Sequence, residues 1–442
     1  MSEAIVRGHW HIPWLRDLPE NWQVVSGKRL FSVRKEFARP NDQQLAATQA
    51  FGVISQKEFE RRVGRRVVQI TQNLEKRRHV EKDDFVISMR SFEGGLERAW
   101  ESGCIRSSYV VLKPRAEAHV SYFQYLFKSH DYIQALRATS NFIRDGQDLN
   151  LSNFSLVDLP LPPVDDQRFI AKFLDWHGAQ TAKLIRAKKK IIALLNEQKQ
   201  AIIHRAVTRG LDPNAKLEAS GVSWLGDVPD GWQIKRLKWV THLQRGYDLP
   251  ADKRISGPFP VVSSGGIIDR HVESKVKAPG VAMGRYGSTE AVFYLEEDFW
   301  PHNTSLFVTK FYGNVPRWCY YLLRSISKVD HAGKSAVPGI DRKDLFDIVV
   351  AVPDYAQQLA IVRGIEALSL ELNTAISKIE TEIALIQEFR TCLVADVVTG
   401  KLDIRAIAAR LPDAELPPID ELIVDDELDE ADDDTEAAEV HA

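Results

Sequence analysis

Apolar residues recur with helical spacing along two stretches of the chain, one near its middle and one near its end. No proline interrupts residues 166–209 or residues 354–410. The apolar positions are Ile170, Leu174, Leu184, Ile191, Leu195 and Ile202, and then Ile361, Ile365, Leu368, Leu372, Ile376, Ile379, Ile383, Ile386, Leu393 and Val397. This pattern predicts two helices of about 43 residues, each about 65 Å long, that pair as a coiled coil.

Before each helix the pattern changes to short β-branched and aromatic runs separated by Gly, Asn and Pro. Residues 109–112 and 305–308 are examples of such runs. We therefore expect two globular parts of mixed α and β structure, each with one helix, near residues 122–128 and 316–324. The order of the strands does not follow from the sequence.

The chain also repeats itself. The segment WLRDLPENWQV at Trp14 returns as WLGDVPDGWQI at Trp224, and AVTRGLD, ending at Asp212, returns as VVTGKLD, ending at Asp403. A weaker match sets the loop after Met89 against the loop after Met283. These matches indicate one unit present twice, and we assign the four tryptophans of the first motif to packing.

The charges of the two predicted helices are complementary. Residues 166–209 include ten basic residues, whereas the second stretch carries Glu366, Glu371, Glu380, Glu382, Glu388 and Asp396 against three basic residues. Two repeated units bury both apolar seams if their helices lie antiparallel. In that arrangement we expect Arg186, Lys189 and Lys190 to approach Glu380 and Glu382.

The amino-acid composition indicates the class of partner that the chain binds. The net charge is only −3, but residues 413–442 hold 14 of the 61 acidic residues and none of the 58 basic ones. The rest of the chain is therefore basic, which favours a polyanionic partner, and the acidic tail is typical of disorder. No apolar run spans a membrane and no signal peptide is recognisable, so we expect a cytoplasmic protein. The three cysteines lack metal or disulfide spacing, and we interpret them as core residues.

Catalytic signatures are weak. Gly333-Lys-Ser lacks the glycine that a phosphate-binding loop needs at position 328, and Glu273-Ser-Lys275 has no acidic partner at a nuclease spacing. A methyltransferase would need an Asn/Asp-Pro-Pro-aromatic loop, but both Pro-Pro pairs follow leucine. We predict a chain with no catalytic centre and no metal site.

The motif WLGDVPDGW, the turn LPLPPVDDQRFI into a helix, the helix end AVTRGLD and their duplication together resemble the specificity subunits of type I restriction-modification systems. The resemblance covers residues 10–410. This family usually has Pro-Pro-x-x-Glu-Gln at the helix start, where this chain has Asp166-Gln167 in the first copy. The second copy has Gln357-Gln358, with Asp354 in place of the second proline.

The resemblance implies an α+β fold in which two pseudo-repeated target recognition domains are separated by two long antiparallel coiled-coil helices. The corresponding boundaries are 1–160 for the first recognition domain, 161–212 for the first helix, 213–352 for a linker and the second recognition domain, 353–410 for the second helix and 411–442 for the tail. Each recognition domain would read half of a split sequence in double-stranded DNA. Two modification subunits that methylate adenine, and possible restriction subunits, would supply S-adenosylmethionine, ATP and Mg chemistry, with no cofactor on this chain.

Candidate DNA contacts come from residue chemistry, because base-reading residues vary within the family. A basic stretch suited to phosphates comprises Arg61, Arg62, Arg65, Arg66, Lys76, Arg77 and Arg78. The loops after Met89 and Met283 offer guanidinium, hydroxyl and aromatic groups for base edges: Arg90, Ser91, Arg285, Tyr286 and Ser288. Weaker candidates are Ser263, Ser264, Arg270 and Asn303, the last within His302-Asn303-Thr304.

Two other functions remain open at this stage. A two-headed adaptor that binds proteins would share the duplicated architecture, but its binding would not weaken steeply with salt. A nuclease or methyltransferase that acts alone would show turnover on DNA with magnesium and S-adenosylmethionine.

Overall fold

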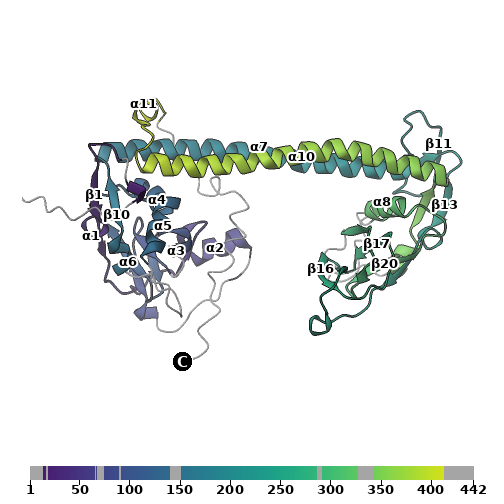
Figure 1. The fold of residues 1–442 in the computed structure, drawn as a ribbon, viewed down its shortest axis with the longest axis horizontal. Helices are drawn as coiled ribbons and strands as arrows, with labels where there is room; N and C mark the ends of the chain where they lie inside the picture. Colours follow the sequence, from purple (N-terminus) through teal and green to yellow (C-terminus); the bar gives the residue numbers. More distant parts are fainter. Residues whose placement is uncertain are drawn as a thin grey trace, which may run out of the picture. The chain divides into compact units, whose positions relative to one another are not determined.

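The computed structural model describes residues 13–15, 18–64, 66, 74–88, 91–139, 151–285, 291–326 and 342–412 (Figure 1). The chain divides into two compact units. Unit 1 combines Met1–Lys189 with Glu380–Ala442, and unit 2 is Lys190–Ile379. Unit 1 is thus built from both ends of the chain.

The centre of unit 1 is a four-stranded antiparallel sheet in the order β2-β9-β6-β7. These strands are β2 (Phe31–Val33), β9 (Val110–Pro114), β6 (Phe85–Ile87) and β7 (Glu97–Arg98). Three two-stranded pairs surround it: β1 (Gln23–Ser26) with β10 (Asp158–Leu161), β3 (Leu45–Thr48) with β4 (Gly52–Ser55), and β5 (Arg78–Val80) with β8 (Gly103–Ile105). The short helices are α1 (Gly27–Leu30), α2 (Gln56–Val63), α3 (Ser91–Gly94), α4 (Val120–Lys128), α5 (His130–Ala138) and α6 (Leu151–Leu156), with 3-10 turns η1 (Pro13–Leu15) and η2 (Leu74–Lys76).

An aromatic cluster joins this sheet to α4. Phe31 from the sheet meets Phe123 and Phe127 of α4 at ring-centroid distances of 5.2 and 5.4 Å. Burying large aromatic side chains is a major source of folding free energy, and edge-to-face pairs add to it. These contacts hold α4, which the sequence predicts near residues 122–128, against the sheet.

Unit 2 has a second four-stranded antiparallel sheet, in the order β14-β20-β17-β18. These strands are β14 (His242–Arg245), β20 (Ser305–Lys310), β17 (Gly280–Gly284) and β18 (Val292–Leu295). The remaining strands are β15 (Phe259–Ser263) between β16 (Gly266–His271) and β19 (Trp300–Pro301), β13 (Gln233–Arg236) with β21 (Val349–Val352), and β11 (Leu217–Ala219) with β12 (Asp227–Pro229). The helices are α8 (Pro316–Ile326) and α9 (Arg342–Phe346), with 3-10 turns η3 (Leu237–Trp239) and η4 (Ala251–Lys253).

The weaker sequence match concerns the ends of β6 and β17. Ile87, the last residue of β6, lies opposite Val110 in unit 1, and Met283 of β17 lies opposite Leu306 in unit 2. Met89 lies outside the described residues, so the pairing of Met89 with Met283 stays a prediction.

The predicted long helices are both present. They are α7 (Val164–Arg209), with 46 residues, and α10 (Tyr355–Val398), with 44 residues. In unit 1 the Lys188 ammonium lies 2.6 Å from the Glu382 carboxylate, and in unit 2 Lys199 donates a 2.6 Å hydrogen bond to Asn373. As the residue number rises along α7, the number of the contacted residue on α10 falls, so the paired segments are antiparallel. Lys188, which contacts Glu382, is a neighbour of the basic residues that the sequence predicts there.

A buried glutamine anchors the start of each long helix. The Gln167 carbonyl accepts a hydrogen bond from the His119 backbone N–H at 2.8 Å, and its amide donates to the carbonyls of Glu117 and Pro162. The Gln358 carbonyl accepts from the Val315 N–H, and its amide donates to Asn314 and Pro353. Each side chain ties the helix start to the residues just before α4 or α8.

The departure from Pro-Pro in the second copy has a local explanation. The Asp354 carboxylate accepts a 2.7 Å hydrogen bond from the Gln357 N–H, and the Gln357 side chain accepts one from the Asp354 N–H. This reciprocal pair is a capping box, which satisfies N–H groups that a helix start leaves unpaired. Asp354 therefore caps α10 at the position where proline is usual.

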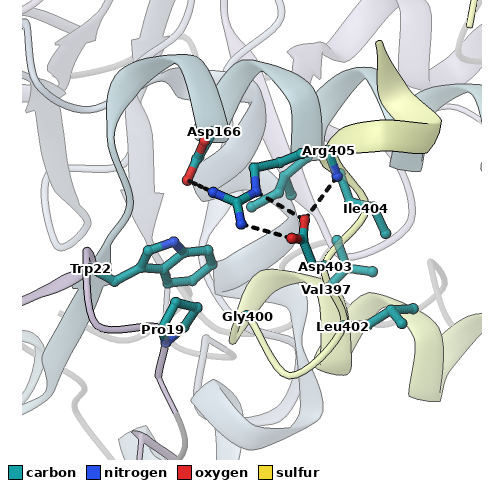
Figure 2. A pocket seen from close by; sticks show the side chains of 10 residues that line it. Pro19, Trp22, Asp166, Val397, Gly400, Leu402, Asp403, Ile404 and Arg405 are labelled. Carbon is teal, nitrogen blue, oxygen red and sulfur yellow. Dashed lines mark hydrogen bonds and ion pairs between the residues drawn. The ribbon is translucent and has the colours of Figure 1, made fainter. Parts of the chain in front are cut away.

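The chain after α10 returns to the N-terminal part of unit 1. The Tyr122 hydroxyl donates to the Val398 carbonyl at 2.9 Å, and Gly400 has φ 74°. A Cβ atom on Gly400 would lie 2.5 Å from Pro19, so glycine is required. Figure 2 shows this region, where Arg405 bridges Asp403 and Asp166 beside Trp22. The short helix α11 (Arg405–Ala408) follows.

The tryptophans and cysteines can now be placed. Trp14 and Trp22 pack edge-on against Tyr132 and Tyr122. Trp232 is buried in the core of unit 2, and the Trp224 indole donates to the Val349 carbonyl at 3.1 Å. Their packing role is confirmed. Cys104 and Cys319 are buried as expected, but Cys392 is exposed on α10, so its assignment to the core is wrong.

Candidate nucleic-acid interface

The clearest polar surface in unit 2 lies at one edge of its four-stranded sheet. Strands β14 and β17 both run antiparallel to β20, so their last residues lie beside the first residue of β20. Three loops therefore meet there, beside the turn between β15 and β16. We call this surface the unit 2 loop edge and define it by Arg245–Asp248, Ser264, Arg285 and His302–Thr304.

Backbone hydrogen bonds fix these loops to one another. The Arg285 N–H donates to the Thr304 carbonyl at 3.1 Å, and the Tyr247 N–H donates to the Pro301 carbonyl at 2.8 Å. The Ser264 N–H donates to the Thr304 hydroxyl at 3.3 Å. A Cβ atom on Gly246 would lie 2.1 Å from the His302 carbonyl oxygen, so only glycine permits this close approach. The loop edge is consequently a preorganised surface.

Its side chains suit hydrogen bonding to base edges. Asn303 donates to the Asp248 carboxylate at 2.5 Å, while the Arg245 guanidinium donates to the Asn303 carbonyl at 3.2 Å. Burial and the nearby Arg254 guanidinium lower the pKa of His302, so its imidazole is neutral at pH 7. The Tyr247 ring is 39% exposed beside them. Guanidinium, amide and hydroxyl groups are those that read bases in the major groove.

The structure places the candidate residues of unit 2 in different environments. Ser264, Arg285 and Asn303 come together at the loop edge. Ser263 is buried, and its hydroxyl donates to the Gly266 carbonyl, so it shapes the turn between β15 and β16. Arg270 is exposed and pairs with Glu297 at 2.8 Å. Tyr286 and Ser288 lie outside the described residues.

In unit 1 the predicted basic stretch is partly neutralised. Arg61 and Arg62, on α2, both bond the Glu58 carboxylate, at 2.6 and 2.8 Å. These bonds, first from Arg61 and then from Arg62, lower the pKa of Glu58 to about 2. Arg66 and Lys76 are exposed and Arg65 lies outside the described residues. The net positive charge of this surface is thus smaller than the sequence indicates.

Two candidates in unit 1 are not available at the surface. Arg77 is only 6% exposed, so its predicted role in phosphate binding does not fit this conformation. Ser91 is fully buried, and its hydroxyl accepts a 2.9 Å hydrogen bond from the Ser88 N–H at the start of α3. Both were selected by residue type, which does not reveal whether a side chain lies at the surface or in the core. Arg90 lies outside the described residues, and Arg78 is partly exposed over the ring of Phe37.

Sequence reasoning missed Arg245 and Tyr247. The signal was present as Arg-Gly-Tyr-Asp at residues 245–248, since glycine beside aromatic and charged residues is common in binding loops. This segment forms a surface only together with the loop at residues 302–304. The strand order must be known before the two loops can be recognised as neighbours.

Two searches of the described residues bear on other functions. Within those ranges, no three His, Cys, Asp or Glu side chains are grouped in a way that could hold a metal ion. The Glu273 carboxylate instead forms a 3.5 Å ion pair with Lys275. None of the helices in the described ranges combines the length and apolar composition needed to cross a membrane. Gly333-Lys-Ser lies outside these ranges.

Comparison with known proteins finds similarity to one family over part of the chain. Residues 19–194 match the model of the type I restriction modification DNA specificity domain. The chain is 30% identical over 93 residues to the type I restriction enzyme MjaVIII specificity subunit of Methanocaldococcus jannaschii, covering 21% of this chain and 20% of that relative. It is 22% identical over 330 residues to the EcoKI specificity subunit of Escherichia coli K12, covering 66% and 68%.

A solved structure shows the same fold. A chain from a study of complex assembly and conformational transition in a type I R-M system has a TM-score of 0.62 and 13% identity, and the match covers 87% of this chain and all of that one. The chain spans only about a fifth of the archaeal relative, and two thirds of the bacterial one. The domain match, the relatives and the fold together make this chain similar to the specificity subunits of type I restriction-modification systems.

Proposed function

We propose that this chain reads a split, asymmetric sequence in double-stranded DNA, with one target recognition domain in each unit. The observation that carries the proposal is the unit 2 loop edge, where Arg245, Asn303 and His302 offer donors and acceptors from loops held by backbone hydrogen bonds. The match of residues 19–194 to the type I restriction modification DNA specificity domain supports the same role. The basic character of residues 1–412 favours the phosphate backbone as partner.

The two units support a duplicated reader. Each has a four-stranded sheet whose central strand is followed by a helix, and each has a buried glutamine at the start of the next long helix. We interpret them as pseudo-repeated recognition domains, with α7 and α10 as an antiparallel spacer between them. The domain boundaries expected from the sequence remain part of this proposal.

The long helices also offer a docking surface. Large apolar side chains lie exposed on α7 and α10 in addition to those buried between them; they are Leu184, Ile191, Leu194, Leu368, Leu370, Leu385 and Phe389. Exposed apolar groups in such number are typical of protein interfaces. We assign this surface to two modification subunits, which would carry the S-adenosylmethionine chemistry, with ATP and Mg on restriction subunits where these are present.

The test is DNA binding by the full-length chain, with targets selected from random duplexes. We expect a split consensus, and an affinity that falls steeply between about 50 and 200 mM salt. Asn303→Ala should relax the preference at one half-site only, whereas Asn214→Ala, at an exposed loop position, should leave both unchanged. Failure to select any split sequence, or binding that ignores salt, would favour the adaptor. Turnover by the chain alone would favour an enzyme.

A second test exchanges residues 26–160 for the equivalent part of another family member. Independent recognition domains predict that one half-site changes and the other stays. A change in both half-sites would contradict the assignment of one reader to each unit.

A further inference from the structure

The sheet of unit 1 has an edge equivalent to the unit 2 loop edge, and the sequence does not single it out. Val33 lies opposite Leu112 in unit 1, and Leu243 lies opposite Val308 in unit 2. Four residues beyond Val33 is Phe37, and four residues beyond Leu243 is Tyr247. The two aromatic residues therefore follow their sheets at the same number of residues, and both rings are exposed, Phe37 at 57%.

The turn that precedes the central strand matches as well. In unit 1 the Tyr109 N–H donates to the Arg106 carbonyl at 3.2 Å, and in unit 2 the Ser305 N–H donates to the His302 carbonyl at 2.9 Å. Arg106-Ser107-Ser108 thus corresponds to His302-Asn303-Thr304. Both triplets are polar and both precede a buried strand.

Two pieces of backbone pairing bring the aromatic ring and this turn together in unit 1. Phe37 bridges Arg78, and Arg78 pairs with Ile105, the residue before Arg106. The Arg78 guanidinium lies over the Phe37 ring, 4.9 Å from its centroid. The exposed ring therefore lies at a bridge to β5, and the two exposed serines lie in the turn that follows β8, the strand paired with β5. Among the described residues, neither serine side chain is used in a hydrogen bond of the fold.

We propose that Phe37, Arg78 and the turn Arg106-Ser107-Ser108 form the DNA-reading surface of unit 1, on the double-stranded target that the proposed function assigns to this chain. The serine hydroxyls suit contacts to base edges or phosphate oxygens, and the ring suits stacking on the sugar-phosphate backbone or insertion into a groove. This surface replaces the loop after Met89, and the buried Ser91 and Arg77, as the source of first half-site recognition.

The experiment uses two variants of the full-length chain, Phe37→Ala and the double variant Ser107→Glu/Ser108→Glu. The matched control for the ring is Trp239→Ala, because Trp239 is 64% exposed, lies 5.6 Å from the Lys238 ammonium, and precedes β14 at the opposite end of the unit 2 sheet. The matched control for charge is Lys113→Glu, at the far end of β9 from the serines. Thermal unfolding of each variant checks that it folds as the wild type does.

We expect each test variant to lose about tenfold or more in affinity for the selected target, and to lose the base preference of one half-site. Asn303→Ala should affect the other half-site. Test variants that bind and select like their controls, while wild type and Asn303→Ala behave as expected, would overturn this inference and leave the proposed function intact. A wild-type chain that selects no split target would overturn the proposed function itself.

Discussion

Gln358 illustrates how one residue can hold a helix start in place. It is 2% exposed and satisfies an N–H donor, a side-chain acceptor and a backbone carbonyl at once. A buried polar group that loses its partners costs more free energy than the hydrogen bond contributes. The neighbouring Gln357 is exposed, so a comparison of these two glutamines shows the effect of burial on the same residue type.

We predict that Gln358→Glu lowers the free energy of unfolding by about 2–3 kcal/mol, because the new carboxylate cannot donate to Asn314 and Pro353. Gln357→Glu should change it little, since a glutamate keeps the acceptor of the capping box. Urea unfolding followed by circular dichroism measures both. Equal stability of the two variants would contradict the anchoring role.

His79 lies between two carboxylates in unit 1. Its Nδ1 is 2.7 Å from Asp42, and its Nε2 is 2.9 Å from Glu81. Burial alone would lower the pKa of His79, but the hydrogen bonds with Glu81 and Asp42 outweigh burial and raise it. The bond from His79, followed by bonds from Ser102 and Arg39, lowers the pKa of Glu81 to about 2. The imidazole is therefore stabilised in its charged form.

A raised pKa in the folded state gives stability that is complete below the unfolded pKa of 6.5 and is lost as pH rises through the folded value. We predict that His79→Gln lowers the melting temperature most near pH 5.5, and progressively less toward pH 9. The control Asn41→Ala, at an exposed position without a titratable side chain, should show a difference that is flat with pH. A difference for His79→Gln that grows with pH would reverse the assigned sign.

At the scale of elements, the paired helices combine an apolar seam with charges of opposite sign. Ile185 and Ile383 are buried in unit 1, and Ile203 and Ile365 are buried in unit 2. The Lys188–Glu382 pair flanks the seam and is partly exposed on both sides. Ion pairs of this kind contribute about 0–1 kcal/mol, so the seam supplies most of the stability and the charges favour one register.

We predict that Lys188→Glu and Glu382→Lys each destabilise the helix pair by up to about 1 kcal/mol, and that the double reversal restores most of the loss. Thermal unfolding at low salt and at about 1 M salt tests this, because the Debye length falls to about 3 Å at 1 M and should remove the difference. Additive damage in the double variant would mean that the two side chains do not interact.

The sequence allowed the long helices to be predicted almost to their ends, because apolar spacing and prolines mark them. It also located α4 and α8, whose large side chains Tyr122 and Trp318 are fully buried. Strand order was out of reach, since the strands of each sheet pair at long range and in non-sequential order, as β2 pairs with β9. The loop edges could not be assembled without that order, so Phe37 and Tyr247 were overlooked.

At the scale of the whole molecule, the proposed spacer role can be tested through helix register. The Lys188–Glu382 and Lys199–Asn373 contacts place Ala193 close to the level of Lys378. An insertion of seven residues after each of these two positions keeps the apolar seam in phase and lengthens the paired helices by about 10 Å. A rise of about 3.4 Å per base pair converts this length to about three base pairs.

We therefore predict that this double insertion lengthens the spacer between half-sites by about three base pairs and leaves both half-sites unchanged, as read by target selection. Seven residues inserted into the loop at Pro213–Lys216, outside both helices, should leave the spacer unchanged. If a folded, DNA-binding double insertion kept the original spacer, the helices would not set that distance.

The construction of unit 1 from both ends of the chain has a consequence for synthesis on the ribosome. Val397, Val398 and Ile404 are buried in its core, so this core lacks part of its packing until the last turns of α10 emerge. About 200 residues separate Lys189 from those turns, which corresponds to about 10–40 s of translation. During that interval the aromatic surface around Tyr122 stays uncovered, whereas the contiguous unit 2 can close earlier. The part of unit 1 that is synthesised first therefore completes its folding last. A premature stop codon before Val397 would leave this part exposed to chaperones and proteases.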